Sequence, residues 1–108
     1  MDPIPRKAKN YWNAYGKSPF REWIVREVDG TIRQRINARI RRIEEFGNYG
    51  DCEPVGGGVF ELKFDTGPGH RVYFGIDGSE IILLGGGDKS TQKSDIQKAQ
   101  ESWGDYNA

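Results

Sequence analysis

Residues Val59–Gly85, VFELKFDTGPGHRVYFGIDGSEIILLG, contain three apolar runs separated by two turn signals. Apolar and polar residues alternate in Val59–Asp65 and in His70–Ile76, which is typical of strands buried on one face. The turn signals are TGPG and Asp77-Gly78, and the second favours a tight hairpin. Glu80–Gly85 is apolar on both faces and therefore indicates a central strand. The stretch predicts an antiparallel meander of three strands.

The alternation also assigns side chains to the two faces of this predicted sheet. One face is apolar, and helices must cover it because no other segment can bury it. This apolar face carries Phe60, Leu62, Phe64, Val72 and Phe74. The opposite face carries Lys63, Arg71 and Tyr73, so we expect cationic and phenolic side chains together on one side of the sheet.

Two helices are expected before these strands. Ser18 as N-cap and Pro19 at the first helical position begin the first helix, which ends at Asp29-Gly30. The second helix begins with a capping box over Thr31–Gln34 and ends at Gly47. The link between the two helices is short, which predicts an αα-hairpin.

A first strand within Ala8–Tyr15 and a last helix over Thr91–Trp103 complete the prediction. The order of elements is then β-α-α-β-β-β-α, and the fold class is α+β with a mostly antiparallel meander sheet. The helical hairpin packs on one face of that sheet. We expect a single domain over residues 1–108, in which residues 1–8 form a flexible N-terminal extension.

The composition of the chain disfavours membrane-spanning, secreted and disulfide-rich classes of protein. The chain has 108 residues, a mean hydropathy of −0.77 and one cysteine, Cys52. It has no apolar run of about 18 residues and no apolar secretory segment near its start, so neither a membrane span nor a secretory signal is expected. A lone cysteine supports no disulfide framework, and a reduced, cytoplasmic protein is the expectation.

The formal net charge of zero hides a strong asymmetry. Residues 1–43 contain 11 lysines and arginines against 4 acidic residues, whereas residues 44–108 contain 5 against 12. Such a split predicts a basic surface beside an acidic one, and the basic surface could attract a polyanion. Alternatively, the two halves fold together and their charges mix over the surface.

The segment Leu83–Ile96, LLGGGDKSTQKSDI, resembles a phosphate-binding loop but fails both nucleotide motifs. A P-loop would need glycines where Leu83 and Asp88 stand, and a dinucleotide motif would need a glycine at Ser90. His70 and Cys52 are the only histidine and cysteine, which disfavours zinc. We therefore expect no metal and no cofactor.

With nucleotide motifs and zinc disfavoured, the remaining prediction for this region is phosphate chemistry by lysine and arginine side chains. Lys63 and Arg71 lie on paired strands, and Lys89 lies where the last strand leads into a helix. Lysine and arginine stabilise the additional charge of a phosphorane-like transition state without metal. The first turn of the last helix adds free N–H groups. Tyr73 could stack on a base or donate to a phosphate.

Three further residues, Arg35, Arg39 and Arg42, form an arginine flank beside the apolar stripe of the second helix. This flank is either a solvated helix face or a contact surface for ribosomal RNA. Gln92 shares the inward face of the last helix with Ile96. Its amide therefore either hydrogen-bonds the glycine-rich segment or contacts substrate.

Three segments carry a family resemblance: PFREWI (Pro19–Ile24), RINARIRRIEEFGNYGDCEPVGGGVFELKFDTGPGHRVYFG (Arg35–Gly75) and LLGGGDKSTQKSDIQKA (Leu83–Ala99). Together they resemble the RelE/ParE superfamily of type II toxins, in particular the HigB-like addiction module killer proteins and their phage-derived relatives. The likeness extends from about Pro19 to Trp103. It implies a single RelE-like toxin domain that a cognate antitoxin, a small helix-turn-helix protein, neutralises.

The resemblance also implies an activity. RelE-like members are endoribonucleases that cut mRNA in the ribosomal A site without metal and so inhibit translation. In that reaction the 2′-hydroxyl of the message attacks the adjacent phosphodiester and leaves a cyclic phosphate. ParE relatives instead inhibit DNA gyrase, which remains an alternative, as does a non-catalytic relative that only binds antitoxin.

Position by position, Lys63 matches a basic catalytic residue on the second strand and Arg71 matches the family arginine on the third. Lys89 falls where RelE-type toxins place a basic residue after the fourth strand. Gln92 belongs to the D-K-x-x-Q ending of this branch. The general base is open, because Glu61 replaces a frequent lysine and the C-terminal tyrosine has no clear match. The candidates for acid/base chemistry are Glu61, His70, Tyr73 and Asp88.

Overall fold

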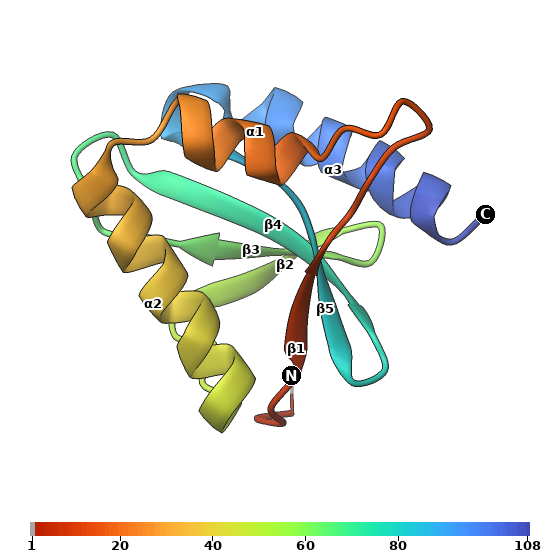
Figure 1. Cartoon of the computed structure of the whole chain (residues 1–108), viewed down its shortest axis with the longest axis horizontal. Coiled ribbons are helices and arrows are strands. Elements are labelled where there is room, and N and C mark those ends of the chain that lie inside the picture. The colour runs from red at the N-terminus through yellow and green to blue at the C-terminus, as the bar shows by residue number, and fades with distance from the viewer. Residues whose placement is uncertain (1) are drawn as a thin grey trace.

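The computed structural model describes residues 2–108 and shows an α+β fold with a five-stranded mixed sheet and three α-helices (Figure 1). The elements in chain order are β1 (Lys7–Asn10), α1 (Pro19–Arg26), α2 (Gly30–Phe46), β2 (Cys52–Gly56), β3 (Val59–Lys63), β4 (His70–Asp77), β5 (Glu80–Asp88), the 3₁₀-helix η1 (Lys89–Thr91) and α3 (Gln92–Tyr106). Within the described residues, no helix is long and apolar enough to cross a membrane.

The predicted three-stranded meander is confirmed, but the sheet is larger and is not purely antiparallel. Its strand order is β1-β5-β4-β3-β2, and β1 runs parallel to β5 while the other pairs are antiparallel. Strand β2, which the sequence pattern did not predict, adds an edge strand beside β3. This strand contains Pro54 and lacks alternation, and an edge position tolerates both because one side needs no hydrogen-bond partner.

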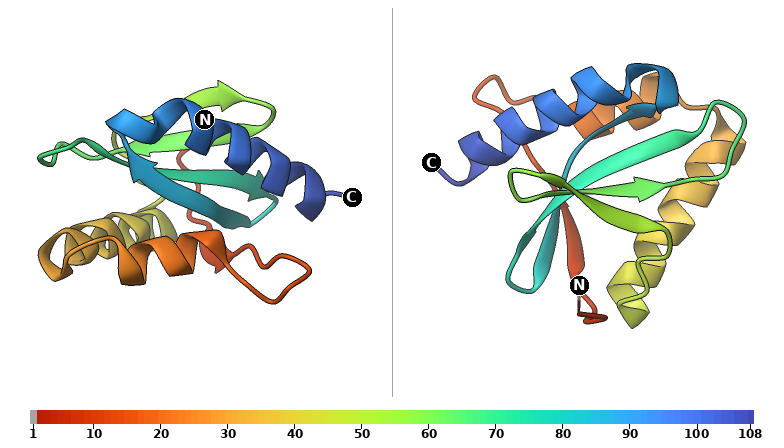
Figure 2. Two further views of the ribbon diagram at one scale, coloured as in Figure 1. Left: turned by 90° about the horizontal axis from the view of Figure 1, so that it is seen from above. Right: turned by 180° about the vertical axis from the view of Figure 1, so that it is seen from behind.

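Helices cover both faces of the sheet (Figure 2). The helical hairpin α1–α2 covers the predicted apolar face, where Leu62, Val72 and Phe74 pack with Phe20 and Ile36 in the main core. The opposite face was expected to present cationic and phenolic side chains. Instead α3 lies across most of it and buries a second cluster, which consists of Tyr11, Val59, Tyr73, Ile82, Leu84 and Ala99.

Strand β5 includes the three glycines that the sequence suggested as a loop. Gly86 faces α1, where an added Cβ would overlap the indole of Trp23. Gly87 faces α3, where an added Cβ would overlap the carboxylate of Asp95. None of the three glycines has a positive φ, so backbone conformation does not require them. Two of them therefore serve to let helices approach both faces of β5 closely.

Capping residues in the sequence correctly predicted the start of α1 and the end of α2. Ser18 is the N-cap of α1, where its side chain accepts from the Arg21 N–H, and Pro19 opens the helix. Gly47 ends α2 in the left-handed conformation with φ of 66°. The expected Thr31–Gln34 capping box is wrong, because Asp29 is the N-cap of α2 and its carboxylate accepts from the N–H groups of Thr31 and Ile32.

Other boundaries shift by a few residues. The first strand is Lys7–Asn10 instead of lying within Ala8–Tyr15, so the expected 1–8 extension ends earlier; Met1 lies outside the described residues. Strand β3 stops at Lys63, before Asp65, while β5 continues to Asp88. The last helix covers Gln92–Tyr106 after η1, because Asp88 caps the 3₁₀ turn first.

Replacing Gly86 by alanine should destabilise the protein by about 1–3 kcal/mol, because the added methyl group must displace the Trp23 ring from a packed core. Gly85→Ala is the matched control, since no heavy atom lies within 4 Å of the added group there. We expect the control to change the free energy of unfolding by less than about 0.5 kcal/mol. Urea denaturation followed by circular dichroism measures both, and equal losses would contradict the close-approach explanation.

Candidate functional site

The three cations singled out from the sequence meet at one end of the sheet. Lys63 ends β3 and is paired across the strands with Arg71 near the start of β4, while Lys89 begins η1 directly after β5. All three line one open pocket of about 430 Å³. The β3–β4 loop, Thr66–Gly69, forms another wall of this basic pocket and projects at the left of Figure 1.

Arg71 is the most firmly held of the three cations. Its side chain is 12% exposed, and Nη1 donates to the carbonyls of Gly69 and His70 at 3.1 and 3.2 Å. Its Nε lies 3.7 Å from Oε1 of buried Glu61. A guanidinium fixed in this way is preorganised, so it need not reorient when an anion enters the pocket.

Lys63 and Lys89 are less constrained. The Lys63 Nζ lies 2.5 Å from Oε1 of Glu53 on the edge strand β2, and this hydrogen bond raises the pKa of Lys63. A phosphate that binds Lys63 must therefore compete with Glu53. Lys89 is exposed and makes no ion pair within residues 2–108, so its ammonium group can move toward a ligand.

Two of the four acid/base candidates lie beneath α3 instead of lining the basic pocket. Glu61 and Tyr73 are both fully buried and are paired across β3 and β4. Gln92 Nε2 donates to Oε2 of Glu61 at 2.8 Å, so the Gln92 amide points into the protein and not toward the glycine-rich strand. Burial, and after it the charge of Glu61, raises the pKa of Tyr73 well above its ordinary value.

The other two candidates are held by local hydrogen bonds. The Asp88 carboxylate caps η1 and accepts from the backbone N–H and hydroxyl of Ser90 at 2.8 and 2.5 Å, and these bonds lower the pKa of Asp88. His70 Nδ1 lies 2.5 Å from the hydroxyl of Thr66. The His70 ring also packs against Trp23, on the α1 side of the sheet.

The carboxylates that line the basic pocket are Asp51 and Asp65, both exposed and both missed as site candidates. The signal for Asp65 was present in the sequence. It follows Lys63 by two residues in the alternating segment Val59–Asp65, a pattern that predicts both side chains on the same side. The signal for Asp51 was absent, because the strand that follows it was not recognised.

The arginine flank lies next to the basic pocket. Its three residues line a hollow of about 310 Å³ that shares Phe64 and Asp65 with that pocket. Arg39 serves the fold: it donates to the carbonyl oxygens of Tyr49 and Lys63 at 3.2 and 2.9 Å, and its guanidinium lies 4.4 Å from the Phe64 ring centre. Burial lowers the pKa of Arg39. The exposed members of the flank are Arg35 and Arg42.

A buried polar cluster underlies the basic pocket and joins it to α3. Besides the Gln92–Glu61 hydrogen bond, three enclosed polar atoms have no hydrogen-bond partner among residues 2–108: Oε1 of Glu61, Nε of Arg71 and the Tyr73 hydroxyl. The Arg71 charge partly compensates the Glu61 carboxylate across 3.7 Å. Because buried charges are costly without partners, the Gln92 donor must contribute strongly to the docking of α3.

The chain has a curated relative whose description names no activity. The chain is 46% identical over 82 residues to an uncharacterized protein of Haemophilus influenzae, and the match covers 75% of this chain and 82% of that protein. No family model matches the chain. No solved structure matches it either.

Replacing Gln92 by alanine should cost about 1–3 kcal/mol of unfolding free energy, because a buried carboxylate oxygen loses its hydrogen-bond donor. The control is Gln97→Ala, an identical change at an exposed position of the same helix. Its expected effect is below about 0.5 kcal/mol. Guanidinium denaturation followed by tryptophan fluorescence gives both values. If the Gln92→Ala variant is as stable as the control, the Gln92–Glu61 hydrogen bond does not stabilise the packing of α3.

Proposed function

We propose that this chain, which belongs to the same family as the uncharacterized Haemophilus influenzae protein, is the toxin of a type II toxin–antitoxin system and cuts mRNA on the ribosome. The observation that carries the proposal is the convergence of Lys63, Arg71 and Lys89 on one open pocket. The sequence resemblance to RelE-like toxins supports it. Its partners are then the ribosome, mRNA and a cognate antitoxin.

The geometry suits a single-stranded RNA segment. The basic pocket is open and shallow enough to admit a phosphodiester still joined to both neighbouring riboses, and its cations come from three different elements. Arg35 and Arg42 extend the positive surface along α2 toward neighbouring phosphates. Arginine and lysine contacts to phosphates supply affinity without reading sequence.

The proposed reaction is an internal transesterification. The 2′-oxygen attacks the adjacent phosphorus, the bond from phosphorus to the 5′-oxygen breaks, and a 2′,3′-cyclic phosphate and a free 5′-hydroxyl result. Arg71 and Lys89 stabilise the added negative charge on the phosphorane oxygens. The leaving 5′-oxygen takes a proton from an ammonium group or from water in the open pocket.

Asp65 is the carboxylate to which we assign removal of the 2′-hydroxyl proton. Glu61 and Tyr73 are buried, and the Asp88 carboxylate is occupied as a cap. Asp65 is exposed and borders both the basic pocket and the arginine flank, so an RNA strand that spans the two passes beside it. A general base of this kind contributes about 10²–10⁴-fold to the rate.

Lys89→Ala should lower mRNA cleavage about 10²–10³-fold, because it removes one cation that faces the transition-state charge. Lys93→Ala is the matched control, since this exposed lysine lies one turn further along the same segment and does not line the pocket. Primer extension on translating ribosomes measures the cut sites. Inhibition of gyrase supercoiling by a wild-type protein that leaves mRNA intact would select the gyrase alternative.

Asp65→Asn should lower the single-turnover cleavage rate by at least about 10²-fold while leaving RNA affinity unchanged or improved, because the change removes a base and a negative charge. Asp51→Asn tests the other carboxylate of the pocket and should retain cleavage within about tenfold of wild type. Filter binding and rapid-quench cleavage separate affinity from rate. A slow Asp51→Asn variant beside a normal Asp65→Asn variant would transfer the role to Asp51.

A further inference from the structure

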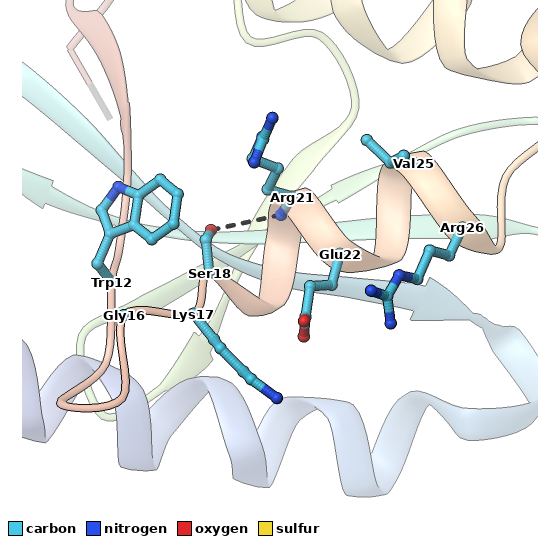
Figure 3. Close-up of a pocket in the computed structure, with 8 residues that line it drawn as sticks. All are labelled: Trp12, Gly16, Lys17, Ser18, Arg21, Glu22, Val25 and Arg26. Atoms are coloured by element: carbon cyan, nitrogen blue, oxygen red, sulfur yellow. Dashed lines mark hydrogen bonds between the residues drawn. The ribbon is translucent and has the colours of Figure 1, made fainter.

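A third hollow runs along α1 and shares no lining residue with the basic pocket. It has a volume of about 240 Å³ and lies between the loop that follows β1 and the outer side of α1. Figure 3 shows its lining, to which the loop contributes Trp12 and Lys17 and the helix contributes Arg21, Val25 and Arg26. We refer to it as the Trp12 hollow. In Figures 1 and 2 this loop and the β3–β4 loop lie at opposite ends of the molecule.

The apolar side chains of the Trp12 hollow are exposed although the fold does not need them there. Trp12 is 51% exposed, Val25 is 55% exposed, and Tyr15 on the same loop is 88% exposed. These are three of the five large hydrophobic side chains that the described chain exposes. The inward side of α1 is already filled by Phe20, Trp23 and Ile24. Exposed aromatic and aliphatic groups gathered in one place are typical of a binding surface.

The charged side chains around the hollow are predominantly positive. Lys17, Arg21 and Arg26 line the hollow together with one carboxylate, Glu22, and none of these four forms an ion pair within residues 2–108. Glu22 also borders the groove between α1 and α3, so it lies at the edge that the two hollows share. The local excess of two positive charges attracts an anionic partner and orients it before contact.

We propose that the Trp12 hollow binds an acidic segment of a partner protein, with an apolar side chain seated between Trp12 and Val25 and carboxylates paired with Lys17, Arg21 and Arg26. Trp and Arg are the residues that dominate the binding energy of protein–protein interfaces. The lining contains one aromatic ring, that of Trp12, and Val25 offers no second ring on which a base could stack. The hollow also shares no lining residue with the basic pocket, where the RNA strand is proposed to bind. The proposal does not depend on the nuclease activity.

An unbiased peptide selection tests the chemistry of this partner. A display library of random 12-residue peptides is selected against the purified full-length protein, with counter-selection against a Trp12→Ala/Arg21→Glu variant. We expect the recovered peptides to contain several Asp or Glu residues and at least one aliphatic or aromatic residue. Their affinity, measured by fluorescence anisotropy, should fall at least tenfold for Trp12→Ala alone and for Arg21→Glu alone. It should also weaken as the salt concentration increases.

Two substitutions elsewhere provide matched controls. Phe46→Ala removes an aromatic ring that is 68% exposed on α2, and Arg41→Glu reverses an exposed charge on the same helix. Neither should alter peptide affinity by more than twofold. In NMR spectra the indole N–H of Trp12 should shift when peptide is added, while the buried indole of Trp23 should not.

The alternatives give different results. Recovery of neutral or basic peptides would overturn the proposal. So would a selection in which every recovered peptide also binds the Trp12→Ala/Arg21→Glu variant. A single-stranded 12-nucleotide RNA that shifts the Trp12 indole and loses affinity with Arg21→Glu would replace the protein partner by RNA. Self-association that the same variant abolishes, measured by analytical ultracentrifugation, would replace it by a second copy of the chain.

Discussion

Close packing of helices against both faces of β5 is the constraint on which the candidate site depends. Trp23 of α1 lies over Gly86, and Asp95 of α3 lies over Gly87. A side chain at either glycine would overlap the residue that lies over it. Because β5 is held from both sides where it ends, Lys89 begins η1 at a fixed place beside Arg71. The glycines that resembled a phosphate loop thus act indirectly, by placing one cation next to two others.

The second constraint is electrostatic. A buried carboxylate under the pocket, Glu61, draws the Arg71 guanidinium inward, while Gln92 ties the same carboxylate to α3. An arginine held by backbone carbonyls and a buried charge keeps its orientation without a ligand. The same burial takes Glu61 and Tyr73 away from the basic pocket, so in the proposed reaction proton transfer falls to the carboxylates on the rim of that pocket. A single buried charge therefore determines both which cation is rigid and which acids remain available.

The sequence predicted those features that local patterns determine. Alternation in Val59–Lys63 and His70–Asp77 gave the strands, the apolar face and the Lys63–Arg71 pair, and Ser18 and Gly47 gave helix ends. What it missed depends on partners distant in the chain. Strand β2 has no pattern of its own, and nothing in Lys7–Asn10 indicates a parallel partner. Polar residues on a strand normally face solvent, so only the position of α3 reveals that Glu61 is buried.

Three acidic residues of the C-terminal half have defined partners in the structure, which bears on the charge asymmetry of the chain. In the C-terminal half, Glu53 pairs with Lys63, Glu61 is buried beside Arg71, and Asp88 caps η1. Glu53 and Glu61 each lie beside a cation, so their charges are partly compensated within the protein. The arginines of the N-terminal half include exposed members that form no ion pair within the described part of the chain, at the flank on α2 and at the Trp12 hollow on α1. A chain with zero formal charge therefore presents two basic surfaces, one on α2 and one on α1, which share no lining residue, so the two proposed partners do not compete for the same side chains.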